Sequence, residues 1–156
     1  FGLTSLDAVD GARRISVRFQ KGSAISAQKV MEAPELDLAI LAFSGWKGVP
    51  LRIERGQEEK ADVEFVLLGY LPGIGLRMVH GRTSEYGGGL EKDALQEKSA
   101  FNAGLSGGPM LNLKGKVIGI HLRSPSAEAR DEGWVSVERA GGFIETSIRS
   151  LDTRTY

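Results

Sequence analysis

Short stretches of alternating apolar and polar residues, separated by polar or glycine-rich turns, constrain the fold of this chain more than any other feature. Arg14–Phe19 alternates in this way and runs into the turn-forming stretch Gln20–Ser23, which predicts a strand and then a turn. Lys114-Gly115 predicts a hairpin turn. The chain is therefore predicted to be all-β, and periodicity leaves a sandwich and a barrel open. The further predicted strands are Ile25–Met31, Leu36–Phe43, Leu51–Glu54, Asp62–Tyr70, Leu76–Arg82, Lys116–Arg123 and Trp134–Glu138.

One segment near the C-terminus departs from this pattern. Apolar residues between 143 and 151 recur at helical spacing after a glycine pair, which predicts a closing helix over about 142–151. The glycine run at 86–89 and the charged stretch at 125–133 are predicted as long exposed loops. Trp46 and Trp134 are predicted to lie in the core rather than to contact ligands.

The composition excludes several classes of function. The chain has 156 residues, 41% hydrophobic and 26% charged, which is enough to bury one sizeable core or two small ones. Lys plus Arg and Asp plus Glu each number 20, so we predict no attraction to nucleic acid. Without cysteine there are no disulfides or metal thiolates, and we predict no cofactor. No apolar run is long enough for membrane insertion. Because the chain opens on Phe1, we expect a processed chain or a fragment.

The stretch Asn102–Pro109 carries the most informative motif. Glycines flank Ser106, so the backbone can turn sharply and direct its N–H groups at a developing oxyanion, which suits acyl transfer. The alternative is an ordinary glycine-rich turn between strands. The string also fits the G-x-S-x-G elbow of α/β-hydrolases, but that elbow runs into a helix, whereas here Pro109 leads to a predicted hairpin.

The segment Phe101–Ile120 closely resembles the region around the active serine in bacterial trypsin-like peptidases of the HtrA/Deg and glutamyl endopeptidase types. The resemblance implies two six-stranded Greek-key β-barrels and a short C-terminal helix, with Ser106 at the nucleophile position. It also implies that the N–H groups of Gly104 and Ser106 form the oxyanion hole. The single domain would span 1–156, with a first barrel of about 1–60 that lacks its first strand, and a second barrel of about 61–140.

Two further segments resemble the catalytic motifs of that family. Ala33–Leu41 is similar to the strand whose aspartate orients the catalytic histidine, so Asp37 takes that position. Thr4–Ala12 is similar to the segment that carries the histidine, and Asp7 stands in the histidine column. The substitution is natural, introduced, or the result of a misplaced alignment, and we favour the first. Because a serine needs a base, this loss predicts very slow proteolysis. The two carboxylates would share a proton or attract a cation, which makes Asp7 and Asp37 candidate ligands in a hypothetical metal site.

The strand ending at His121 resembles the wall of the specificity pocket, which includes Ile120, and glutamyl endopeptidases have a histidine at the same place. His121 would then bind an acidic side chain, with Arg123 adding positive charge on the same side. Phe101 stands where those enzymes have a small hydroxyl residue and would fill the pocket. The alternative is that His121 is a structural histidine with a satisfied hydrogen bond.

These observations predict a severely impaired or inactive peptidase-type domain that binds polypeptide beside the strand ending at His121. The alternative is an active serine endopeptidase that cuts after acidic residues. A third possibility is an interaction domain that uses the loop 125–133. The sequence leaves the oligomeric state open, and family analogy suggests a periplasmic or secreted location.

Overall fold

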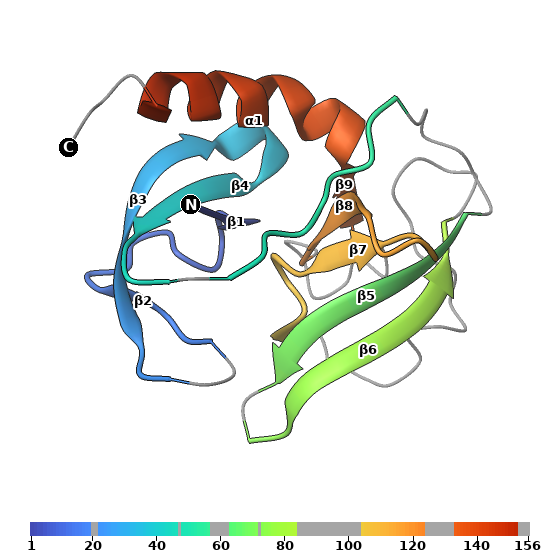
Figure 1. The fold of residues 1–156 in the computed structure, drawn as a ribbon, viewed down its shortest axis with the longest axis horizontal. Coiled ribbons are helices and arrows are strands. Elements are labelled where there is room, and N and C mark those ends of the chain that lie inside the picture. Colours follow the sequence, from blue (N-terminus) through green and yellow to red (C-terminus); the bar gives the residue numbers. More distant parts are fainter. Residues whose placement is uncertain are drawn as a thin grey trace.

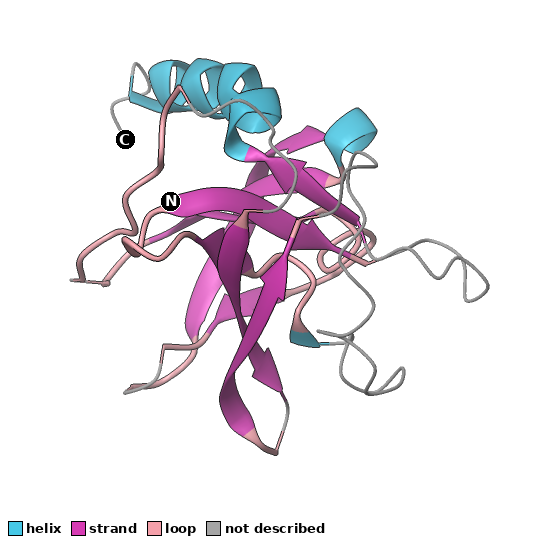
Figure 2. Cartoon of the chain, turned by 90° about the vertical axis from the view of Figure 1, so that its right-hand side faces the viewer, coloured by secondary structure: helices cyan, strands magenta, loops and turns pink. Residues whose placement is uncertain are grey.

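The structure is a computed structural model of the chain, and it contains two antiparallel β-sheets and one long helix (Figure 1). Viewed from the side, the helix lies at one end of the molecule and the strands of both sheets lie below it (Figure 2). No helix in the part of the chain that is described has the length and apolar character needed to cross a membrane. The described residues are 1–19, 22–46, 48–56, 63–71, 73–83, 104–123 and 133–152.

The first sheet has four strands in the order β1-β4-β3-β2. They are β1 (Gly2–Ser5), β2 (Ile15–Val17), β3 (Ile25–Ala33) and β4 (Leu38–Phe43), and every neighbouring pair is antiparallel. The short 3₁₀ turn η1 (Pro34–Leu36) connects β3 to β4. Apolar side chains of this sheet and of the turn after β1 form one core cluster, whose buried members are Val9, Ala27, Ala39 and Leu41.

The second sheet has five strands in the order β6-β5-β7-β8-β9. They are β5 (Glu64–Leu71), β6 (Gly75–Arg82), β7 (Pro109–Leu111), β8 (Val117–Leu122) and β9 (Gly133–Ser136). β8 is buried along nearly its whole length and has a neighbouring strand on each side, β7 and β9. A second core cluster lies against this sheet and consists of Phe65, Leu67, Leu105, Met110 and Ile118.

A third cluster joins the two sheets and the helix α1 (Val137–Asp152). It brings together Leu38 of the first sheet, Ile120 and Val135 of the second, and Ala140 of the helix. The two sheets therefore share one apolar interface that α1 covers from above in Figure 1.

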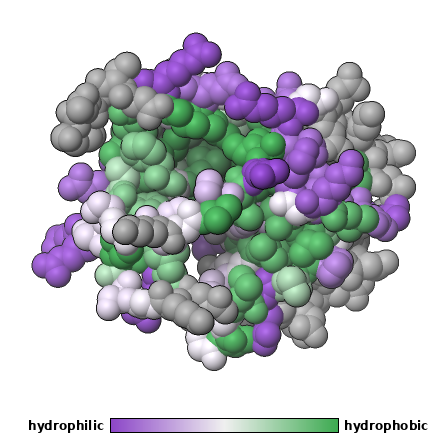
Figure 3. Space-filling view, in the orientation of Figure 1, coloured by the Kyte–Doolittle hydropathy of each residue, from purple (hydrophilic) through white to green (hydrophobic). Residues whose placement is uncertain are grey.

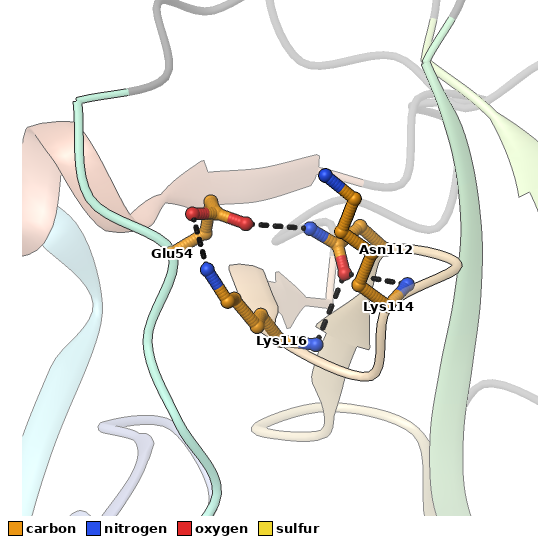
Figure 4. A network of polar contacts seen from close by, with 4 residues as sticks. All are labelled: Glu54, Asn112, Lys114 and Lys116. Atoms are coloured by element: carbon orange, nitrogen blue, oxygen red, sulfur yellow. Dashed lines mark hydrogen bonds and ion pairs between the residues drawn. The ribbon is translucent and has the colours of Figure 1, made fainter.

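The segment between the sheets, 48–56, is fastened to the start of β8. Ile53 forms an isolated parallel bridge with Val117, and Lys116 Nζ donates to Glu54 Oε1 at 2.9 Å. Asn112 donates to the other oxygen of Glu54 at 3.0 Å and accepts two backbone N–H groups of the hairpin turn (Figure 4). Apolar residues of this segment stay exposed, among them Val49, and apolar surface gathers on this face of the molecule (Figure 3).

The structure confirms the predicted mostly β class with one C-terminal helix. The described residues form a four-stranded and a five-stranded sheet, and the two six-stranded barrels stay a prediction. Three other predictions are corrected. The predicted strand Leu51–Glu54 contributes only the bridge at Ile53. The helix begins at Val137, five residues before the predicted 142, because the Ser136 hydroxyl accepts the N–H of Arg139 at 3.1 Å and caps it. Trp46 is 39% exposed and stacks on Phe19 instead of lying in the core.

Candidate active site

The loop before β7 carries Ser106 and is hydrogen-bonded to β8. The Gly107 N–H donates to the His121 carbonyl at 2.8 Å, and the His121 N–H donates to the Gly108 carbonyl at 2.9 Å. Leu105, on the other side of Ser106, is fully buried and accepts the N–H of Gly108 at 2.8 Å. The backbone is thus fixed on both sides of the serine.

Gly107 brings this loop against the first sheet. Its φ of 79° lies in the left-handed region, which favours glycine. A Cβ at this position would lie 2.5 Å from Thr4 Oγ1 and 2.9 Å from the backbone nitrogen of Ser5. Glycine therefore permits a close approach between the serine loop and the end of β1, and this approach places Ser106 beside the segment that follows β1.

The Ser106 hydroxyl has three polar neighbours. Its Oγ lies 3.1 Å from Asp7 Oδ1 and 3.0 Å from the hydroxyl of Ser5, and it accepts the backbone N–H of Arg123 at 3.2 Å. The sequence prediction placed Ser106 and Asp7 in one site, and the structure brings their side chains into hydrogen-bond contact.

The Asp37 carboxylate accepts a hydrogen bond from the backbone of Asp7 and does not contact the Asp7 carboxylate. Asp37 follows η1 in a left-handed conformation with φ of 51°. Its Oδ1 accepts the N–H of Asp7 at 2.9 Å, and its carbonyl accepts the N–H of Leu6 at 2.8 Å. These two bonds connect the start of β4 to the turn after β1. Asp7 therefore lies between Ser106 and Asp37, and it contacts both of them.

Burial raises the pKa of the Asp37 carboxyl above its ordinary value of 3.8. The hydrogen bonds from the N–H groups of Asp7 and Leu6 oppose this rise, and the negative charge of Asp7 adds to it. The folded protein therefore holds Asp37 in an environment that disfavours its charged form.

Arg123 takes a different place from the one predicted. Instead of lying beside His121 to receive an acidic side chain, its Nε lies 3.8 Å from Asp7 Oδ2. Both side chains remain partly accessible, with 61% of Arg123 and 34% of Asp7 exposed. Asp7 thus offers one carboxylate oxygen to Ser106 and the other to the guanidinium of Arg123.

The predicted specificity residues on β8 are buried. His121 is 0% exposed and Ile120 is 4% exposed. Both edges of β8 are also paired, since Ile120 faces Pro109 of β7 and His121 faces Trp134 of β9. A polypeptide therefore has no free edge beside the strand that ends at His121, which corrects the predicted docking place. Phe101 lies outside the described residues.

The hypothetical metal site gains no support from this geometry. Within the described part of the chain, no group of three or more His, Asp or Glu side chains is placed to hold a metal ion. The positive charge beside Asp7 comes instead from Arg123. The role of the Gly104 and Ser106 N–H groups as an oxyanion hole stays a prediction.

Sequence reasoning missed Ser5. Its side chain is fully buried, at 0% exposure, and its hydroxyl touches that of Ser106. The signal was present in the sequence, because Ser5 and Asp7 are two residues apart at the end of a strand. No sequence rule, however, says that a strand hydroxyl will meet a residue 101 positions later.

Comparison with known proteins gives the family. The family model for the trypsin-like peptidase domain matches residues 2–120. The chain belongs to this family. The trypsin-like peptidase domain therefore includes β1, the Asp37 segment and the Ser106 loop in one match.

Curated relatives are bacterial proteases. Residues covering 94% of this trypsin-like peptidase domain are 34% identical to a probable periplasmic serine endoprotease DegP-like from Ectopseudomonas mendocina, and 36% identical to one from Pseudomonas putida. A probable periplasmic serine protease do/HhoA-like from Haemophilus influenzae is 31% identical over 80% of the chain. The chain spans less than a third of the length of these relatives, 29%, 29% and 28% respectively.

A solved structure shows the same fold. The serine endoprotease from Yersinia pestis superposes with a TM-score of 0.72 at 24% identity, over 94% of this chain and 53% of that one. At this identity the likeness shows the fold alone.

Proposed function

We propose that this trypsin-like peptidase domain binds polypeptide and, at neutral pH, cleaves it very slowly or not at all. The observation that carries the proposal is the 3.1 Å contact between Ser106 Oγ and Asp7 Oδ1, at the place where the family pattern has an imidazole. A carboxylate is a much weaker proton acceptor than an imidazole, so the attack of the serine on a peptide is slow. Binding does not need a base and is retained.

In this proposal Ser106 occupies the nucleophile position, Asp37 the acidic position and Asp7 the altered base position. The N–H groups of Gly104 and Ser106 form the oxyanion hole. The four- and five-stranded sheets support a two-barrel architecture, with a first barrel of about 1–60 and a second of about 61–140. A polypeptide ligand and a periplasmic location are supported by the names of the relatives, which are periplasmic serine endoproteases.

The alternative, an active endopeptidase that cuts after acidic residues, has less support. It needs His121 and Arg123 to face a bound side chain. His121 is fully buried, and the Arg123 guanidinium lies beside Asp7.

The test uses dye-labelled casein, an unfolded polypeptide, with binding read by anisotropy and cleavage by gel. We expect the native chain to bind without measurable cleavage at pH 7.5, and Asp7→His to cleave the bound polypeptide. Asp10→Asn, an exposed position on the same segment, is the matched control. Rapid cleavage by the native chain that disappears in Ser106→Ala would overturn the proposal, as would the absence of binding. Loss of binding only when residues 125–133 are replaced would favour an interaction domain that uses that loop.

A further inference from the structure

The direction of the Ser106 hydroxyl proton follows from the chemistry of its three neighbours. The backbone N–H of Arg123 can only donate, so it uses a lone pair of Oγ. An ionised carboxylate can only accept, and it accepts more strongly than a hydroxyl. The single proton of Ser106 is therefore directed at Asp7 Oδ1, while the buried hydroxyl of Ser5 is left to donate to Ser106 Oγ.

Asp7 is held in the orientation that a proton acceptor needs. Its backbone is fixed by the 2.9 Å bond to Asp37, and its second oxygen lies 3.8 Å from Arg123 Nε. Arg123 and Asp37 are the charged groups that contact Asp7 in the described part of the chain.

We propose that Asp7 is the general base of Ser106, so that this chain performs slow acyl transfer with a serine–aspartate pair. The inference rests on the proposed nucleophile position of Ser106 and deepens it, because it assigns the residual reaction to a named base. It also predicts activity in mildly acidic solution, where an imidazole base is protonated and an aspartate is not.

The reaction with a peptide balances without any further reagent. Ser106 Oγ forms a bond to the carbonyl carbon while its proton passes to Asp7 Oδ1. The C–N bond then breaks, and the same proton goes to the leaving amine. Water attacks the acyl-serine and gives its proton to Asp7, and the Oγ–C bond breaks as Ser106 recovers a proton, which releases the acid. With a fluorophosphonate an Oγ–P bond forms, the P–F bond breaks and fluoride leaves, while the Ser106 proton passes to Asp7 and from there to solvent.

The test is the rate at which a fluorophosphonate labels Ser106 between pH 4 and 8, within the range where near-ultraviolet circular dichroism shows the native fold. We expect Asp7→Asn to label about 100-fold more slowly than the native chain, the low end of the range for a general base, because a carboxylate is a weak proton acceptor. We expect the native rate to hold from about pH 8 down to 5, and the Asp7→His rate to fall through about pH 6.5. Asp7→Glu, which keeps the carboxylate, should label faster than Asp7→Asn, and Asp10→Asn should match the native chain.

Equal labelling of the native and Asp7→Asn chains would overturn the inference, and so would a native rate that falls near pH 6.5. A native chain that binds casein but is never labelled would also overturn it while leaving the proposed function intact. Labelling that follows the expected pH profile in a chain that binds no casein would overturn the proposed function alone.

Discussion

Gly107 and Thr4 approach so closely that a methyl group on Gly107 would lie 2.5 Å from the Thr4 hydroxyl oxygen. Thr4 lies in β1 of the first sheet and Gly107 in the loop that leads into β7 of the second, and their contact places the serine loop beside the turn that carries Asp7. The geometry of the site thus depends on the absence of a side chain at one position.

Gly107→Ala should destabilise the fold and separate Ser106 from Asp7. The left-handed conformation costs about 1–2 kcal/mol for alanine, and the overlap with Thr4 adds about 1–3 kcal/mol. Urea unfolding measures the sum. Gly115→Ala is the matched control, because Gly115 has a similar φ of 72° and open space around a Cβ. If both variants lose the same stability, the close approach to Thr4 is not a constraint.

Gly141→Ala and Gly142→Ala should each stabilise the protein. Both glycines lie within α1, and a Cβ at either position would meet nothing within 4 Å. Alanine lowers the entropic cost of the helix by about 0.5–1 kcal/mol per site. Thermal unfolding of the two single variants and the double variant measures the gain, and a lower melting temperature in both singles would contradict the expectation.

Asp37→Asn should raise the melting temperature at neutral pH. Burial raises the pKa of Asp37 in the folded state, so its proton stabilises the fold at pH below the unfolded value of 3.8, and that stability is lost as pH rises through the folded value. Asparagine keeps an oxygen acceptor for the Asp7 N–H and tolerates the left-handed conformation. The difference in melting temperature between variant and native chain should shrink as the pH falls towards 3.8; a constant difference would argue against this linkage.

Glu54 should show the opposite pH dependence. The hydrogen bond from Lys116 lowers the pKa of Glu54 below its ordinary value of 4.5, with a further contribution from Asn112. The stabilisation is therefore present above pH 4.5 and lost as the pH falls through the lower folded value. Glu54→Gln should reduce the melting temperature at pH 7 and have less effect near pH 3. An equal effect at both values would mean that the contact does not depend on the charge.

Alternation and turn residues were enough to predict most of the strands, because a half-buried sheet imposes a period of two on the sequence. The Lys114-Gly115 hairpin was confirmed, with the Gly115 N–H donating to the Asn112 carbonyl at 2.9 Å. The start of α1 was missed because a single capping hydroxyl at Ser136, rather than the glycine pair, sets it. Packing of Ala140 against both sheets outweighs the low helix propensity of the glycines.

The sequence brought Ser106, Asp7 and Asp37 together only through family motifs, whose order implied one site. The pairing of Arg123 with Asp7 was not predictable in this way, because it depends on where β8 ends and on which side chain then reaches the turn after β1. The surroundings of His121 were also not predictable. Strand alternation predicts which face of the sheet His121 lies on, but it does not show that both edges of β8 are hydrogen-bonded there.

Residues 48–56 follow the strands of the first sheet in the chain. The bridge between Ile53 and Val117 nevertheless bonds them to the second sheet. Two separately produced polypeptides, residues 1–56 and 63–156, would each keep one side of this contact. The shorter would carry Asp7 and Asp37 with an arm that recognises β8, and the longer would carry Ser106. Mixing them is expected to bring Ser106 and Asp7 together from two chains. Labelling of Ser106 by a fluorophosphonate would then measure how far the two fragments have associated.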